Sequence, residues 1–304
     1  MLSFTSYSYC GRTRARTFAC YHRRALNTLI WIILCTLASG VLSVLAAGTF
    51  LALPSKQREH VLPHLVSFAT GALLGAALLA LIPHAVEAAG MENVHEVGIA
   101  LIAGIALFFV LEKFLLWRHC HDDHCAEHPL GDENEHNQHH QGHDHGHAHQ
   151  HEQARKKASG SLVLVGDALH NVLDGVLIAA AFLTDVHLGI VTALAIMAHE
   201  IPQEVGNFAV LLHSGVSRRR ALVLNLLTSL TAVIGGIVGY FALEEALVVL
   251  PFAVAVAASS LLYVAVADLI PGLHRKVDPR SSITQVLLIG VGIALIAFAE
   301  RQAH

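Results

Sequence analysis

Two short runs in the second half of the chain carry side chains that can bind metal ions. The first reads His-Asn-Val-Leu-Asp-Gly from position 170, and the second reads His-Glu-Ile-Pro-Gln-Glu from position 199. Residues four apart on a helix lie one turn above each other, so each run predicts a column of donors along one helix face. The seven candidate metal ligands are His170, Asn171, Asp174, His199, Glu200, Gln203 and Glu204.

The donor types in the two runs favour a divalent transition metal. Imidazole nitrogens and carboxylate oxygens suit Zn(II), Fe(II), Mn(II) or Cd(II) better than alkali ions. A lone His–Asp pair is more often a structural hydrogen bond than a ligand pair, and a proton relay is a second use of such groups. Because seven donors gather in two runs, we predict a metal site.

The overall composition is that of a membrane protein. The chain has 304 residues, of which 54% are hydrophobic and 14% are charged, and this excludes an ordinary soluble enzyme. The net charge of −4 gives no basis for binding nucleic acid. The five cysteines are odd in number and scattered, so no disulfide framework is predicted.

Hydropathy predicts an all-α membrane protein with eight transmembrane helices, since eight runs can cross an apolar core about 30 Å thick. The donors fall in the fourth and fifth spans. An ionisable group at the bilayer centre costs about 2.5–3.5 kcal/mol on insertion scales, so these groups should face a polar interior. Pro202 is expected to open its helix beside the site, and Gly175 and Gly206 should allow close helix contact. The spans are 29–51, 65–89, 97–117, 161–183, 188–212, 221–243, 247–270 and 283–299.

Basic residues in the connections predict the orientation. The connections after spans 1, 3, 5 and 7 carry 13 Lys and Arg, and those after spans 2, 4 and 6 carry none. Because basic connections stay in the cytoplasm, both termini should lie outside, across a plasma or inner membrane. The N-terminal tail, residues 1–28, opposes this orientation, because the stretch 1–25 holds five Arg and no acid. A misassigned start site, an organellar targeting peptide and a translocated tail are the three interpretations.

A repeated run predicts internal symmetry. The run from Leu73 to Pro83 in span 2 matches the run from Leu261 to Pro271 in span 7. Each residue number in the second run exceeds the matching number in the first run by the same amount, 261 minus 73. We call this difference the repeat offset. The two spans run in opposite directions, as an inverted repeat requires. We therefore predict a 3+2+3 arrangement in which spans 1–3, within 29–118, and spans 6–8, within 161–300, are related.

The connection between spans 3 and 4, residues 119–160, is rich in histidine. Residues 119–151 contain twelve His, with Cys120 and Cys125 among them. The segment has almost no apolar residues, so we expect a disordered cytoplasmic tether. Neutral imidazoles bind Zn(II) reversibly, which favours a metal-collecting loop over a plain spacer.

With these motifs the chain resembles the ZIP family of metal-ion importers, over about residues 29–300. The His-Asn-x-x-Asp-Gly span followed by the His-Glu-x-Pro-x-Glu span is similar to the LIV-1 branch and its bacterial relatives. The resemblance implies import of zinc, or of another divalent metal, through a binuclear site between spans 4 and 5. His170, Asp174, His199 and Gln203 would match the first position, and Asn171, Asp174 and Glu200 the second, with Glu204 as a further candidate.

The chain departs from the family pattern at three positions. Gln203 stands where the branch often has His or Glu, Asn207 replaces a usual Asp, and Gly272 stands where Glu is common. A neutral amide oxygen is a poorer ligand than imidazole or carboxylate, so the preferred metal is open. The expected partners are divalent metal ions and the lipid bilayer, without a catalytic cofactor, and a homodimer is one compatible assembly.

Two other functions compete with metal import. The first is an intramembrane hydrolase, because His199-Glu200-x-x-Gln203 differs at one position from the His-Glu-x-x-His of zinc proteases. Gln203 cannot supply the second imidazole, which argues against it. The second is an exporter of the cation-diffusion type, which also has a His-rich loop. Exporters of that type have six spans and a folded C-terminal domain. This chain instead ends about five residues beyond its last predicted span.

Overall fold

A computed structural model describes residues 14–120, 145–274 and 279–302, and within these ranges the regular elements are helices, without a strand. Their order and bounds are α1 (Arg14–Ala52), α2 (Ser55–Gly75), η1 (Ala76–Leu81), α3 (Ile82–Ala89), η2 (Met91–Asn93), α4 (Val94–Cys120), α5 (His145–Thr184), α6 (Val186–His213), α7 (Arg218–Ser229), α8 (Thr231–Glu244), η3 (Leu247–Val249), α9 (Leu250–Tyr263), η4 (Val264–Leu269), α10 (Ile270–Leu273) and α11 (Pro279–Arg301).

The described chain has seven helices that are long and apolar enough to cross a membrane. This agrees with an integral, multi-pass membrane protein. The seven do not include α6, although α6 has 28 residues, because the polar run from His199 to Glu204 lowers its mean hydropathy. The seven are Leu26–Ala52, Ser55–Ala89, Met91–Lys113, Val163–Thr184, Arg218–Glu244, Leu247–Leu273 and Ser281–Arg301.

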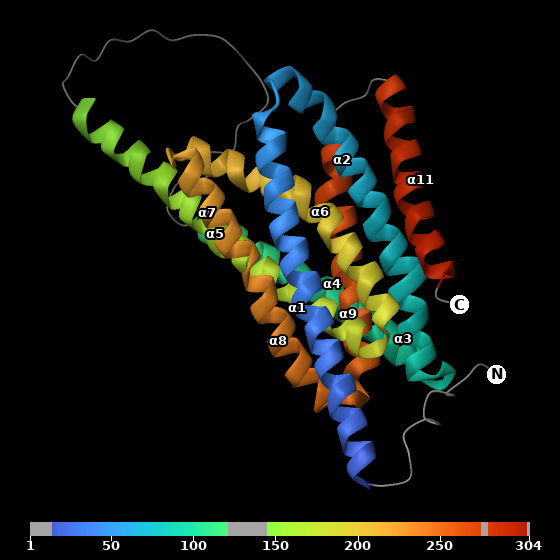
Figure 1. The fold of residues 1–304 in the computed structure, drawn as a ribbon. Helices are drawn as coiled ribbons and strands as arrows, with labels where there is room; N and C mark the ends of the chain where they lie inside the picture. The colour runs from blue at the N-terminus through green and yellow to red at the C-terminus, as the bar shows by residue number, and fades with distance from the viewer. Residues whose placement is uncertain (1–13, 121–144, 275–278, 303–304) are drawn as a thin grey trace.

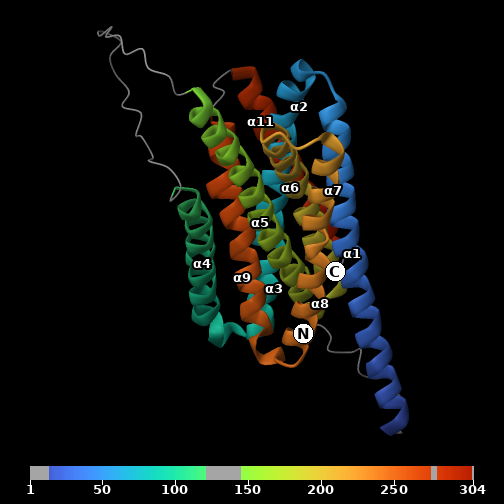
Figure 2. The ribbon, with the colours of Figure 1, turned by 90° about the vertical axis from the view of Figure 1, so that its left-hand side faces the viewer.

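The helices form one elongated bundle, with the connections gathered at its two ends (Figures 1 and 2). The α1–α2 and α6–α7 connections lie at one end, where α4 also finishes and α5 begins. We call this the loop end. The α3–α4, α5–α6 and α8–α9 connections lie at the opposite end, which we call the far end. The connections after the first and fifth predicted spans thus lie at one end, and those after the second, fourth and sixth lie at the other. Which end faces the cytoplasm stays a prediction.

Small residues let the central helices pack closely. A Cβ placed on Gly175 of α5 would lie 2.0 Å from the Ala232 carbonyl oxygen of α8, and one on Gly235 of α8 would lie 1.9 Å from the Val172 carbonyl oxygen of α5. Glycine at these positions allows backbone contact between α5 and α8, as expected for Gly175. The same expectation for Gly206 was wrong, because a Cβ added there would meet no atom within 4 Å.

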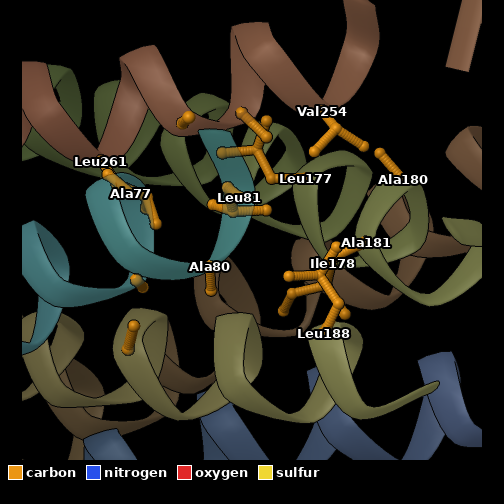
Figure 3. Packing of buried hydrophobic residues seen from close by; sticks show 14 of the residues in the cluster. Ala77, Ala80, Leu81, Leu177, Ile178, Ala180, Ala181, Leu188, Val254 and Leu261 are labelled. Atoms are coloured by element: carbon orange, nitrogen blue, oxygen red, sulfur yellow. The ribbon is translucent and has the colours of Figure 1, made fainter. Parts of the chain in front are cut away.

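A hydrophobic cluster fills the half of the bundle nearer the far end. Side chains from η1, α5, α6 and α9 meet there, as Figure 3 shows. The cluster combines many alanines with a few large side chains, so the helix backbones can approach each other closely. Its wholly buried large members include Leu81, Ile178, Leu188, Ile196 and Leu261.

Two π-helical segments mark the repeated run. The segment η1 covers Ala76–Leu81 and η4 covers Val264–Leu269, so the two segments begin and end at positions related by the repeat offset. A proline follows each segment two residues later, at Pro83 and Pro271. Segments of this kind are rare and short. Their recurrence at this offset means that the sequence repeat extends to the backbone conformation.

Some helix boundaries differ from the sequence prediction. The helix α5 begins at His145, so the last part of the predicted loop 119–160 is helical. This part is rich in Ala, Gln, Glu, Arg and Lys, which are strong helix formers. Residues 121–144, which hold much of the His-rich segment, lie outside the described residues.

Candidate metal site

The antiparallel pair α5 and α6 positions the two donor runs. A single residue, Asp185, separates the helices, and its side chain caps α6 by accepting from the backbone N–H of His187 at 2.7 Å and of Leu188 at 3.2 Å. His170 precedes Asp185 and His199 follows it at almost equal distances along the chain. The two histidines are therefore at the same height on neighbouring helices.

Three of the seven candidate ligands converge between these helices. The Nε2 atoms of His170 and His199 are 3.2 Å apart. An oxygen of Asp174 lies 3.4 Å from the first nitrogen and 3.6 Å from the second. Asp174 and His199 are each 1% exposed, and His170 is half-buried. Within the described ranges, these three residues form the one group of at least three His, Cys, Asp or Glu side chains close enough to share a metal ion.

The distances within this group fit a tetrahedral ion. Ligand atoms at about 2.0–2.1 Å from a tetrahedral zinc lie roughly 3.3 Å from one another. The three separations of 3.2, 3.4 and 3.6 Å bracket that value. The group therefore provides three corners of a tetrahedron with its side chains already in place, and one corner is left for a further ligand.

Glu200 and Glu204 do not belong to this group, because hydroxyl groups of other helices hold them. Oε2 of Glu200 accepts from Ser39 at 2.8 Å and from Ser43 at 3.1 Å, both on α1. Oε1 of Glu204 accepts from Ser229 of α7 at 2.6 Å. The second oxygen of each carboxylate is buried and has no hydrogen-bond partner among the described residues. Each glutamate thus keeps one oxygen available for a cation.

Asn171 is also buried and only partly satisfied. Its amide nitrogen donates to the backbone carbonyl of Asp167 at 3.0 Å. Its Oδ1 has no partner within the described part of the chain. It is one more buried oxygen that faces no donor.

Asp167 is a residue that the sequence analysis missed. Its Oδ1 accepts from Asn207 at 2.7 Å and from Gln203 at 3.3 Å, both on α6. Asp167 lies three residues before His170 and four before Asn171. The helical spacing that selected the other candidates would therefore have placed it on the same face.

A cavity of about 720 Å³ leads from the two histidines toward the loop end. His170 and His199 are in its lining, and so are Gln203 of α6, Glu112 of α4 and Asp268 of η4. The two acidic residues, and Tyr263, whose hydroxyl donates to Glu112, were not among the predicted residues. They come from helices that carry few other polar residues, so no pattern along the chain marked them.

Pro202 does not open α6. The helix runs without interruption from Val186 to His213 with Pro202 inside it. The expectation that Pro202 opens its helix beside the site was therefore wrong. Proline still removes one backbone donor, but close packing against neighbouring helices keeps the helical course.

The amino-acid sequence is similar to those of known proteins. The family described as ZIP zinc transporters matches residues 26–300. The chain belongs to the ZIP family. It is 32% identical to the human zinc transporter ZIP13 over 264 residues, which covers 77% of this chain and 70% of that protein. It is 29% identical to the mouse zinc transporter SLC39A7, covering 80% of this chain and 63% of that protein.

These relatives confirm the resemblance to the ZIP family. A third relative, the zinc transporter zipt-7.1 of Caenorhabditis briggsae, is 32% identical and covers 89% of this chain. The chain spans about two thirds of the length of the human and mouse relatives. All three are named as transporters and none as an enzyme, which favours the transport interpretation over the intramembrane hydrolase.

Proposed function

We propose that this ZIP family member carries divalent transition-metal ions, zinc above all, across a membrane and into the cytoplasm. The observation that carries the proposal is the group of His170, Asp174 and His199, whose two histidines line the cavity. The group has the donor types and the spacing of a zinc site, and it leaves one corner open. An incomplete ligand set suits a site that must release its ion as well as bind it. The names of the relatives support zinc as the main cargo.

The cavity and the hydrophobic cluster support a route through the bundle. The cavity connects the histidines with the loop end. Beyond Asp174 the same helix carries Leu177 and Ile178, which pack in the hydrophobic cluster (Figure 3). Because this cluster follows the site along α5, it would close the way to the far end. If basic connections are cytoplasmic, the loop end and the His-rich segment face the cytoplasm and both termini face outward. This conformation would then release ions inward.

A second ion position is supported by the buried oxygens that lack donors. Asn171, Glu200 and Glu204 each present one such oxygen, and Asp174 lies one turn from Asn171 on α5. A buried acceptor without a donor is costly, and a bound cation would remove that cost. We propose that these oxygens form the second half of a binuclear site, with Gln203 completing the first half.

The packing of the helices supports eight spans in a 3+2+3 arrangement, with α6 as the fifth. An inverted repeat that relates spans 1–3 to spans 6–8 must exchange the contact α2–α11 with α9–α4, and the contact α1–α6 with α8–α5. These four contacts are the most extensive in the described chain. The repeat offset also relates their details. Gly71 meets Gly292 in one contact, and the equivalent positions, Ser259 and Gly104, meet in the other.

Transport assays would test this function directly. Cells that express the chain should accumulate radiolabelled zinc, and substitution of His199 or Asp174 by alanine should abolish uptake without removing protein from the membrane. His213→Ala is the matched control, because His213 lies on the same helix but is exposed at its end. Normal uptake by His199→Ala would refute the proposed site. Loss of zinc from preloaded cells, in place of uptake, would favour the cation-diffusion-type exporter.

A further inference from the structure

Polar contacts between α5 and α6 form a ladder that continues from the metal site toward the loop end. The first rung joins His170 to His199 at 3.2 Å. The second joins Asp167, one turn before His170, to Gln203, one turn after His199, at 3.3 Å. The third joins Asp167 to Asn207, a further turn along α6, at 2.7 Å. We call these residues the polar ladder.

Asp167 fixes the orientation of the amide groups of Gln203 and Asn207 in the polar ladder. A carboxylate accepts hydrogen bonds and cannot donate them, so the amide groups of Gln203 and Asn207 must turn their nitrogens toward it. The nitrogen and oxygen of an amide are bonded to the same trigonal carbon and point in different directions from it. The Oε1 of Gln203 therefore points away from Asp167. Gln203 lines the cavity together with His170 and His199.

We propose that Asp167 is a positioning residue for metal selectivity: it holds Gln203 so that the amide oxygen, and not the amide nitrogen, meets the transported ion. An amide NH₂ group is a donor with no lone pair to offer, and it would repel a cation. With the oxygen turned toward the ion, Gln203 supplies the open corner of the group formed by His170, Asp174 and His199. This inference rests on the proposed function, and it explains how a neutral side chain can serve in that site.

Asp167 contacts Gln203 through one of its two oxygens. It is only 4% exposed, and its Oδ1 accepts both hydrogen bonds of the polar ladder. Its Oδ2 is buried without a hydrogen-bond partner among the described residues. Direct binding of the ion by Oδ2 would appear as an additive effect in the double-mutant cycle below, whereas action through Gln203 would not.

The proposal predicts a particular change in metal preference. An amide oxygen is a hard donor, which matters more to Mn(II) than to Zn(II), because zinc binds well to imidazole. Without Asp167 the amide of Gln203 is free to rotate and to turn its nitrogen inward. The remaining ligands, two imidazoles and one carboxylate, would then favour zinc over manganese more strongly than the intact site does.

The experiment compares three variants in zinc-uptake assays with manganese as the competitor. Asp167→Ala removes the acceptor, Asp167→Asn keeps one acceptor oxygen but removes the charge, and Glu245→Ala is a control at an exposed carboxylate of the far end. For Asp167→Ala we expect the manganese concentration that halves zinc uptake to rise about tenfold, the change for loss of one charge-assisted hydrogen bond. Asp167→Asn and Glu245→Ala should stay near the parent. If Asp167→Asn changes the preference as much as Asp167→Ala, charge and not orientation is responsible, and the proposal fails.

A double-mutant cycle separates positioning from a merely structural role. In a Gln203→Ala background, Asp167→Ala should cause no further change in metal preference, because the group it acts through is gone. Additive effects would overturn the proposal. If Asp167→Ala does not reach the membrane, Asp167→Val, which fills a similar volume, takes its place in the cycle.

Binding of Co(II) to the purified protein gives a readout that does not need transport. The visible absorption of Co(II) depends on its ligands, so Asp167→Ala should alter the spectrum and Glu245→Ala should not. A parent protein that binds Co(II) but carries no zinc would refute the proposed function and leave this inference testable. An unchanged spectrum in Asp167→Ala would refute the inference alone.

Discussion

The spacing between α5 and α8 should control the metal site, and one methyl group is enough to test it. A Cβ on Gly235 would lie 1.9 Å from the carbonyl oxygen of Val172, well inside the 3.0 Å below which real Cβ contacts essentially never occur. The contact atom is backbone, so no side chain can turn aside. Gly235→Ala must therefore push the two helices apart by about 1 Å.

Such a shift is large compared with the tolerance of the site. The helix α5 carries His170 and Asp174, whose donor atoms lie only 3.2–3.6 Å from each other and from His199. A misplacement of about 1 Å can lower a rate by about a hundredfold where several groups must meet. We therefore expect Gly235→Ala to lower zinc uptake by one to two orders of magnitude, that is, about 10- to 100-fold.

Gly290→Ala on α11 is the matched control, because no atom lies within 4 Å of its added Cβ. Replacing a helical glycine by alanine should stabilise a helix by about 0.5–1 kcal/mol where there is space. Zinc uptake, normalised to the amount of protein at the membrane, and thermal unfolding in detergent would be measured for both variants. If Gly235→Ala transports zinc as well as Gly290→Ala does, the close contact between α5 and α8 does not set the geometry of the site.

Three further changes test other parts of the mechanism. Gln203→His should shift preference toward Zn(II) and Gln203→Glu toward Mn(II) or Fe(II), and competition assays in which both keep the parental ranking would exclude Gln203 as a ligand. Deletion of residues 121–150 should leave measurable zinc uptake, and complete loss in a protein that reaches the membrane would contradict this. Replacing Ser39 and Ser43 together by alanine should reduce uptake about tenfold, because it removes both donors of the buried Glu200 carboxylate. Parental uptake by the double variant would show that those hydrogen bonds are dispensable.

The spacing of residues along α5 and α6 made the group of His170, Asp174 and His199 predictable from the sequence. The columns at 170–174 and 199–203 follow from helical periodicity, and the short turn at Asp185 sets them at equal height. Asp167 was open to the same reasoning. It was missed because its role depends on the amides of Gln203 and Asn207, and these looked like weakened ligands when each helix was considered alone.

The hydrogen-bond partners of the Glu200 carboxylate could not be predicted in this way. Ser39 and Ser43 are separated from Glu200 by 161 and 157 residues. Hydroxyl residues in apolar helices usually bond their own backbone, as Thr36 does with the Ile32 carbonyl and Thr70 with the Val66 carbonyl. Which serine reaches a carboxylate on another helix is decided by tertiary packing, and a single sequence does not encode it visibly.

The proposed repeat pairs residues that differ between the two ends of the bundle. Glu112 and Glu300 are equivalent under the repeat offset, and so are His84 and Gly272. At the far end His84 has a side chain that approaches Glu300, with Nδ1 3.6 Å from Oε1. At the loop end Gly272 has no side chain, and Glu112 instead lines the cavity and accepts from Tyr263. Because alternating access requires the two ends to open in turn, residues that differ between the repeats, such as His84 and Gly272, are where the preference for one conformation would be set.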